Sequence, residues 1–269
     1  MFKKFIAVLA AGVLLLSCGG NGSEKKEATG ELQKLVLGVS PVPHQELAEL
    51  VKDDLKAEGI DLEIVVFNDY VQPNLQLKDK SIDANFFQHV PYMEEFGKAN
   101  NIDMVSVGGI HLEPLKAYSD KIKSIEELKD GDEVLIPNDP SNRGRSLILL
   151  DSFGVIKLKD KTKLDASVND IAENPKNLKF TELNSEQIAP RLSEVALALI
   201  NTNNALAAGI NKDKAILVEG KDSPYVNIIT VLKENENDER VAKLVKALRS
   251  EKVKKFIEEK YNGEVTAAF

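Results

Sequence analysis

Residues 34–67, KLVLGVSPVPHQELAELVKDDLKAEGIDLEIVVF, decide the fold class of this chain. Apolar residues dominate positions 34–40, recur at helical spacing over 45–58 and dominate again over 61–67. This pattern predicts a strand, then a helix that stops at Gly59, then a second strand. Two strands joined through a helix within about 30 residues pair in parallel, as in α/β proteins.

The rest of the chain repeats this alternation in two blocks. We expect further strands at the short apolar runs 82–86, 104–107, 115–119, 133–136, 178–183, 195–200 and 227–232. Amphipathic stretches between and after these runs predict helices, and two such helices close the chain. The blocks predict an α/β protein of two lobes, with residues 34–116 and 228–269 in lobe 1 and residues 117–227 in lobe 2.

The amino terminus has the pattern of an export signal. Lys3 and Lys4 precede an uncharged apolar run at 5–16. This run is too short to cross a bilayer, which takes about 20 helical residues. Residues 1–17 are therefore predicted to be a signal peptide that is removed. The remaining 252 of the 269 residues suit one large domain or two of ordinary size.

Cys18, the single cysteine of the chain, follows the apolar run in the string LLSCG at 15–19. Leu-x-small-Cys is the processing box of bacterial lipoproteins, in which a diacylglycerol is attached to the thiol before cleavage. We expect Cys18 to be lipidated and the polar residues 18–33 to form a flexible tether. The folded part would then be anchored at the cell membrane outside the cytoplasm, in the periplasm or at the cell surface. The alternative is an ordinary secretory signal with an incidental cysteine.

Composition and motifs argue against several classes of function. The formal net charge is −8, and loss of the two leader lysines makes it −10, so the surface repels nucleic acid. With Cys18 lipidated, no thiol is left for disulfides, redox chemistry or nucleophilic catalysis. The chain has no G-x-S-x-G, H-E-x-x-H or P-loop motif, so the sequence does not predict an enzyme.

Polar and aromatic residues follow several of the predicted strands. Ligands of open α/β sheets settle beyond the carboxyl ends of strands, so these positions are candidates for a binding site. The segments are SPVPH (40–44), NDYVQP (68–73), FFQHVPY (86–92), NDPSNRGR (138–145) and INTNN (200–204). An arginine at a helix start suits a carboxylate, and aromatic rings suit an apolar or thioether tail. The sequence therefore predicts a site for a zwitterion with an apolar tail, such as an amino acid.

These segments also carry a resemblance to a known family. The strings NDYVQPNL (68–75), NFFQHVPY (85–92) and IPNDPSNRGRSLILL (136–150) resemble the methionine-binding lipoproteins of the NlpA type. The resemblance covers nearly the whole mature chain. It implies a two-lobed periplasmic-binding-protein fold, type II-like, that closes on a free amino acid in the cleft between the lobes and performs no chemistry.

The resemblance also implies a role and partners. The chain would be the lipid-anchored substrate-binding protein of an ABC importer, with a polytopic permease and a cytoplasmic ATPase as partners. The expected ligand is L-methionine, with D-methionine, a methionine-containing dipeptide or another apolar amino acid as alternatives. No cofactor is implied.

The family's site residues map onto nine positions of this chain. They are an aromatic wall of Tyr70, Phe87, His89 and Tyr92, a carboxylate-binding Arg145 with Asn142 beside it, and ammonium-binding amides at Asn201 or Asn203 and at Asn227. The chain departs from the family at residues 201–204, where Asn-Thr-Asn-Asn replaces the frequent Asn-Gly-Asn-Tyr. This departure leaves open which asparagine faces the ligand. Arg143 stands where an acid is common.

The three histidines, His44, His89 and His111, support an alternative function. Each follows a predicted strand, and three converging imidazoles can bind zinc, so the alternative is a metal-ion-binding protein. No two of them have the spacing of three to five residues that is typical of a compact zinc motif. We interpret the nearby acids Glu113 and Asp139 as turn and capping residues.

Overall fold

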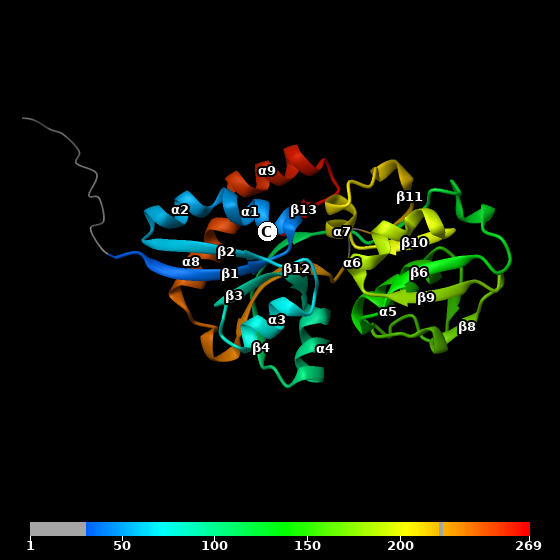
Figure 1. Cartoon of the computed structure of the whole chain (residues 1–269), viewed down its shortest axis with the longest axis horizontal. Coiled ribbons are helices and arrows are strands. Elements are labelled where there is room, and N and C mark those ends of the chain that lie inside the picture. Colours follow the sequence, from blue (N-terminus) through cyan, green and yellow to red (C-terminus); the bar gives the residue numbers. More distant parts are fainter. Residues whose placement is uncertain (1–30, 221–222) are drawn as a thin grey trace, which may run out of the picture.

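The computed structural model describes residues 31–220 and 223–269. The predicted signal peptide, Cys18 and most of the predicted tether lie outside these residues. Figure 1 shows an elongated molecule of two bodies side by side, each built from a sheet with helices packed against it.

The first sheet has six strands in the order β13-β4-β12-β3-β1-β2. They are β1 (Gln33–Val39), β2 (Ile60–Val66), β3 (Ala84–His89), β4 (Met104–Leu112), β12 (Val226–Leu232) and β13 (Thr266–Ala267). Strand β1 runs parallel to both β2 and β3, which confirms the strand–helix–strand unit predicted from residues 34–67. Strand β12 returns late in the sequence and lies antiparallel between β3 and β4.

The helix predicted over residues 45–58 is broken into three pieces. A short π-helical turn (Pro41–Gln45) precedes α1 (Glu46–Leu50) and α2 (Lys52–Ala57). The break lies at Val51, whose N–H bonds to the carbonyl of Ala48 only three residues back.

The remaining helices of the first body cover the two faces of its sheet. They are α3 (Gln72–Lys78), α4 (Val90–Asn100), α8 (Glu239–Leu248) and α9 (Glu251–Tyr261), with a short 3₁₀ turn at Lys233–Asn235. The apolar stripes of α8 and α9 contribute Leu244 and Ile257 to a fully buried core that includes Leu37 of β1 and Phe86 of β3. This core fixes the strand ends that carry the aromatic residues.

The second sheet has five strands in the order β11-β5-β10-β6-β9. They are β5 (Lys116–Tyr118), β6 (Glu133–Pro137), β9 (Lys179–Leu183), β10 (Leu197–Ile200) and β11 (Ala215–Val218). Its helices are α5 (Pro140–Ser152), α6 (Ser185–Ile188) and α7 (Thr202–Ala207), with 3₁₀ turns at Ile125–Glu127, Val168–Asp170, Ala189–Glu194 and Lys212–Lys214. A separate pair of short strands, β7 (Lys157–Leu158) and β8 (Ile171–Glu173), lies beside α5.

The chain crosses between the two bodies twice. It leaves the first sheet after β4 and enters the second at β5, and it returns between β11 and β12. Each sheet has its own buried core, so the two bodies are separate lobes joined by these crossings. The α/β class predicted from the sequence is confirmed.

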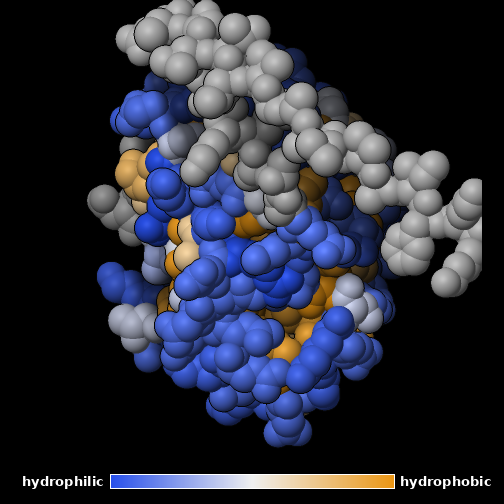
Figure 2. Space-filling model, turned by 90° about the vertical axis from the view of Figure 1, so that its left-hand side faces the viewer, coloured by the Kyte–Doolittle hydropathy of each residue, from blue (hydrophilic) through white to orange (hydrophobic). Residues whose placement is uncertain are grey.

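One end of the first lobe has a mainly polar surface (Figure 2). Figure 2 views the end of this lobe that lies on the left of Figure 1, where hydrophilic side chains cover most of the face and apolar ones show in recesses. Among the described residues, no helix is long and apolar enough to span a bilayer.

Helix α5 starts with a strong cap and a close backbone approach. Asp139 accepts a hydrogen bond from the N–H of Asn142 (2.8 Å), and Pro140 occupies the first helical position. One residue before Arg145, Gly144 packs against the loop of Leu164, so a β-carbon there would lie 1.9 Å from the Leu164 carbonyl oxygen. The absent side chain lets α5 lie close to this loop.

We predict that Gly144→Ala forces these two backbone segments apart and lowers the free energy of unfolding by about 3 kcal/mol. Urea unfolding followed by circular dichroism measures the change. Gly220→Ala is the matched control, because a β-carbon there would meet no atom of the described residues within 4 Å. Equal stability of the two variants would contradict the close approach.

Candidate ligand-binding site

One cavity collects all nine residues implied by the resemblance. It has an empty volume of about 340 Å³. Its lining comprises Tyr70, Phe87, His89, Tyr92, Asn142, Arg145, Asn201, Asn203 and Asn227, together with Gln88, Glu113 and Thr202. Residues from both lobes face this space. The fold thus brings together side chains that are up to 157 positions apart in the sequence.

Aromatic rings of the first lobe form one wall. Tyr70 lies in the loop after β2, Phe87 lies on β3 and Tyr92 lies in the first turn of α4. Their ring centroids are 5.8–6.0 Å apart, in tilted and edge-on contacts. Phe86 points the other way into the core, as strand alternation requires. The three rings therefore offer an apolar surface to the cavity.

His89 belongs to this wall as a neutral imidazole. Its Nδ1 accepts a hydrogen bond from the N–H of Tyr92 (3.3 Å), and its Nε2 lies 3.4 Å from Oδ1 of Asn142. Burial, and then the positive charge of Arg145, lower the pKa of His89 to about 3. The ring is thus uncharged at neutral pH and supports the start of α4.

Arg145 is buried and already paired. Its Nε and Nη2 donate to the carboxylate of Glu219, Nη2 also donates to the carbonyl of Glu113 (2.8 Å), and the guanidinium lies 4.3 Å from the ring centroid of Tyr225. Among the described residues, only Nη1 of this group has no hydrogen-bond partner. The arginine therefore offers one nitrogen, rather than a two-pronged fork, to a ligand.

Glu219 and Tyr225 are site residues that the sequence reasoning missed. Both follow β11, and the run 215–218 is not among the predicted strands, so the strand-end argument passes over them. Their contacts hold the Arg145 side chain on two faces.

Amide side chains of the second lobe form a chain of hydrogen bonds. Asn142 donates to Asp139 through Nδ2 (3.1 Å) and accepts at Oδ1 from Nδ2 of Asn201 (2.8 Å). The Oδ1 of Asn201 is buried and has no partner among the described residues. A buried acceptor without a donor is costly, so this oxygen is prepared for a donor from outside the chain.

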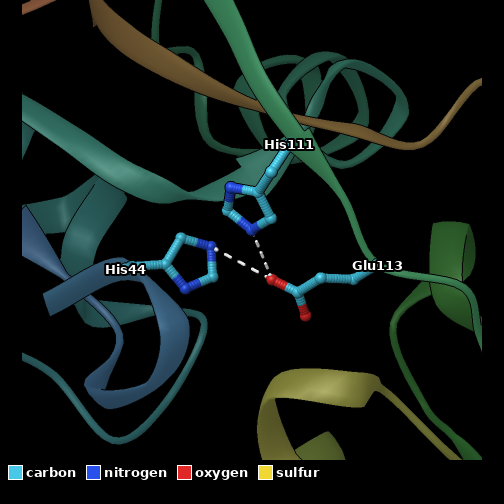
Figure 3. Close-up of side chains that lie close together, drawn as sticks. All are labelled: His44, His111 and Glu113. Atoms are coloured by element: carbon cyan, nitrogen blue, oxygen red, sulfur yellow. Dashed lines mark hydrogen bonds and ion pairs between the residues drawn. The ribbon is translucent and has the colours of Figure 1, made fainter. Parts of the chain in front are cut away.

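Glu113 places a buried negative charge in the cavity wall. Its Oε1 accepts from Nε2 of His111 (2.7 Å) and its Oε2 accepts from the N–H of Asn203 (2.8 Å). Figure 3 shows both histidines, His44 and His111, directed at this carboxylate. Burial raises the pKa of Glu113, but the bond from His111 and the nearby His44 outweigh burial and leave the pKa below its ordinary value. The group is therefore ionised at neutral pH.

The structure corrects the interpretation of Glu113 as a turn residue. The observed β4 ends at Leu112, five residues beyond the predicted end, so Glu113 is itself a strand-end residue. Asp139 is a helix cap, as predicted.

His44 orients Asn227. Its Nε2 lies 3.0 Å from Oδ1 of Asn227 and 3.6 Å from Oε1 of Glu113, and both of these atoms are acceptors. Burial lowers the pKa of His44 to about 4, so the neutral ring carries its proton on Nε2. With Oδ1 engaged, the donor Nδ2 is the free end of Asn227 among the described residues.

The histidines do not converge as the metal hypothesis requires. Within the described part of the chain, the group that could hold an ion is His44, His111 and Glu113, and His89 is outside it. Both nitrogens of His89 face Asn142 and the backbone of Tyr92. The Nε2 atoms of His44 and His111 are already hydrogen-bonded, so the metal alternative loses its basis.

A family model described as NlpA lipoprotein matches residues 35–269 of the chain. The chain belongs to the NlpA lipoprotein family. It is similar to the D-methionine-binding lipoprotein MetQ of Salmonella typhi, with 43% identity over 98% of this chain and 98% of that protein. It is 42% identical to the D-methionine-binding lipoprotein MetQ of Escherichia coli strain K12, over 97% of this chain and 96% of that protein.

Solved structures of the NlpA family share the fold. One of them is described as a nutrient-binding protein from Burkholderia cenocepacia bound to methionine. It has a TM-score of 0.84 and 42% identity, and the match covers 87% of this chain and 100% of that protein. The predicted resemblance and the two-lobed periplasmic-binding-protein fold are thereby confirmed. NlpA relatives are substrate-binding proteins of transporters and not enzymes.

Because His44 and His89 are neutral when buried, we predict that the free energy of unfolding decreases as the pH is lowered. His44 and His89 take up protons near pH 6.5 in the unfolded chain but only near pH 4 and pH 3 when folded. Between these values the unfolded chain binds more protons, so acid favours unfolding. Each histidine should lower the free energy of unfolding by about 2 kcal/mol between pH 8 and pH 5.

Urea unfolding at pH 8 and pH 5 tests this expectation with His44→Gln, which keeps a donor toward Asn227 but does not titrate in this range. The variant should lose about 2 kcal/mol less than the unmodified protein between the two pH values. Comparing the two proteins cancels the other titrating groups. If both lose the same free energy, His44 is not held neutral by burial.

Proposed function

We propose that this chain is the substrate-binding protein of an ABC importer and binds methionine between its lobes. The single observation that carries the proposal is the cavity, which is lined by aromatic rings together with buried charged groups and amides. The relative from Burkholderia cenocepacia supports it, because that structure is described as bound to methionine.

The rings would hold the methionine tail. Thioether sulfur contacts aromatic rings favourably, by about 0.3–1.5 kcal/mol for each contact. Tyr70, Phe87 and Tyr92 present three rings to the same space. The cavity is small, which favours one amino acid over a dipeptide.

The ligand carboxylate would bind to donors of both lobes. Within the part of the chain that the structure describes, Nη1 of Arg145 is the free nitrogen of the guanidinium, and Nδ2 of Asn227 is the free end of its amide. A carboxylate accepts from both, and the arginine supplies the charge. We therefore assign Asn227 to the carboxylate, although the resemblance implies that it binds the ammonium.

The ligand ammonium would bind to acceptors. Oδ1 of Asn201 is a buried oxygen to which no group of residues 31–220 and 223–269 donates, and Glu113 adds a negative charge to the same cavity. Arg145 and Glu219 compensate each other, so Glu113 leaves the site with a net negative charge. This balance favours an ammonium-bearing ligand, and both L-methionine and D-methionine satisfy it.

Binding would couple to closure of the lobes. We propose that the two lobes have nearly the predicted bounds, 34–116 with 228–269 and 117–227. We shift these bounds by one or two residues, because β5 (Lys116–Tyr118) belongs to the second sheet and β12 (Val226–Leu232) to the first. Both lobes would contact the ligand only when closed. A ligand that contacts both lobes stabilises the closed form over the open one. The permease and its ATPase would receive the ligand from this form at the membrane.

Titration calorimetry with L-methionine tests the function, on protein unfolded and refolded to remove any ligand acquired during expression. We expect a dissociation constant in the micromolar range or below. Arg145→Ala should raise it at least tenfold, because the ligand carboxylate loses its charged partner. Arg143→Ala, two residues away on α5 and paired with Glu182, is the control and should bind like the unmodified protein. No heat of binding in the unmodified protein contradicts the function, and equal binding by both variants contradicts the role of Arg145.

The anchor is tested by Cys18→Ser in the full chain. The variant should lose the diacylglycerol and move from the membrane fraction to the soluble extracellular or periplasmic fraction, as measured by fractionation and immunoblotting. Its affinity for methionine should not change, because the tether precedes the first strand. Unchanged membrane association would contradict lipidation at Cys18.

A further inference from the structure

The phenol of Tyr70 links the two lobes at the edge of the cavity. The hydroxyl of Tyr70 donates to Oδ1 of Asn203 (2.6 Å) and accepts from Nδ2 of Asn204 (3.2 Å). Tyr70 lies in the loop after β2 of the first lobe, and the two asparagines lie in the first turns of α7 in the second. We infer that Tyr70, Asn203 and Asn204 form a latch that limits the length of the ligand tail and the rate of release. This inference rests on the proposed function.

The asparagine side of the latch is held in place by the chain crossing. The N–H of Asn203 donates to Oε2 of Glu113 (2.8 Å), and the hydroxyl of Thr202 donates to the carbonyl of Pro114 (2.6 Å). These two bonds fix the start of α7 against residues that link the lobes. The amides of Asn203 and Asn204 are therefore placed before the cleft closes.

The tyrosine side is held equally firmly. The hydroxyl of Tyr92 donates to the backbone carbonyl of Tyr70 (2.7 Å), and Oδ1 of Asp69 accepts the N–H groups of Val71 and Gln72 (2.8 Å each). Burial raises the pKa of Tyr70 well above its ordinary value, so its hydroxyl stays a donor at physiological pH. The latch thus joins two rigid segments rather than two flexible side chains.

The latch separates the cavity from open grooves. Tyr70 and Asn203 line the cavity on one side. On the other side, Tyr70 borders a groove of about 600 Å³, and Asn203 and Asn204 border a second groove of about 590 Å³. A ligand tail that extends past the rings would meet these hydrogen bonds first. Beyond them space is available, so the latch rather than the volume outside restricts the tail.

Two consequences follow for a bound ligand. Opening the lobes to release it breaks both hydrogen bonds of the Tyr70 hydroxyl, so the latch slows release. A longer tail can fit only if one of the bonds breaks, so the latch weakens binding of longer homologues. Loss of one such bond changes an equilibrium or a rate by about two- to tenfold.

Asn204→Ala tests the latch, because this side chain contacts Tyr70 and is not part of the cavity lining. The probes are L-methionine and L-ethionine, whose tail is one methylene longer, with release rates from stopped-flow displacement and affinities from calorimetry. The variant should release methionine about two- to tenfold faster, and its preference for methionine over ethionine should shrink by a similar factor. Asn204→Leu, which keeps the side-chain size but removes the donor, should behave in the same way.

Asn68→Ala is the matched control, because Asn68 borders the same outer groove and is exposed. It should leave both quantities unchanged. If both Asn204 variants match this control while circular dichroism shows them folded, the latch is overturned. The proposed function fails separately, because it predicts that the unmodified protein binds methionine whatever the variants do.

Discussion

The buried carboxylate of Glu113 is the interaction on which the site depends. It lies where the chain crosses from β4 to β5, and it joins two histidines of the first lobe to the start of α7 in the second. A charge taken out of water is tolerated only when donors surround it, so His111 and the N–H of Asn203 are required partners. Through His44 the same carboxylate is linked to the orientation of Asn227.

A second buried charge, that of Arg145, is paired with Glu219 and not with the carboxylate of Glu113. Arg145 is neutralised by Glu219 and packed on Tyr225, which fixes the guanidinium in place and leaves one nitrogen free among the described residues. The cavity therefore holds one uncompensated negative charge, at Glu113, together with the donors of Arg145 and Asn227. Donors and acceptors in one cavity match a zwitterion, and the aromatic rings that line the same cavity match its apolar tail.

The fold was predictable wherever local pattern decides structure. The parallel unit of β1, β2 and β3 follows from alternating apolar runs and a helix between them, and α8 and α9 follow from their apolar stripes. The break at Val51 depends on a tightened turn, which the apolar spacing of the helix does not reveal. Strand β11 was missed although its four residues, AILV, form a short apolar run that is typical of a strand.

The sequence by itself determined the α/β class and the side chains that gather at the strand ends. The alternation of predicted strands and helices, and the residues that end them, are local properties of the sequence. It also placed Tyr70, Arg145 and Asn201 in one candidate site through their segments. Only the tertiary structure decided how each group is used. The pairing of Arg145 with Glu219 joins residues 74 positions apart, and the engaged end of each amide depends on neighbours that are distant in the sequence, such as His44 for Asn227. Contacts of this kind depend on how distant segments pack together, and the spacing of residues along the chain does not show this.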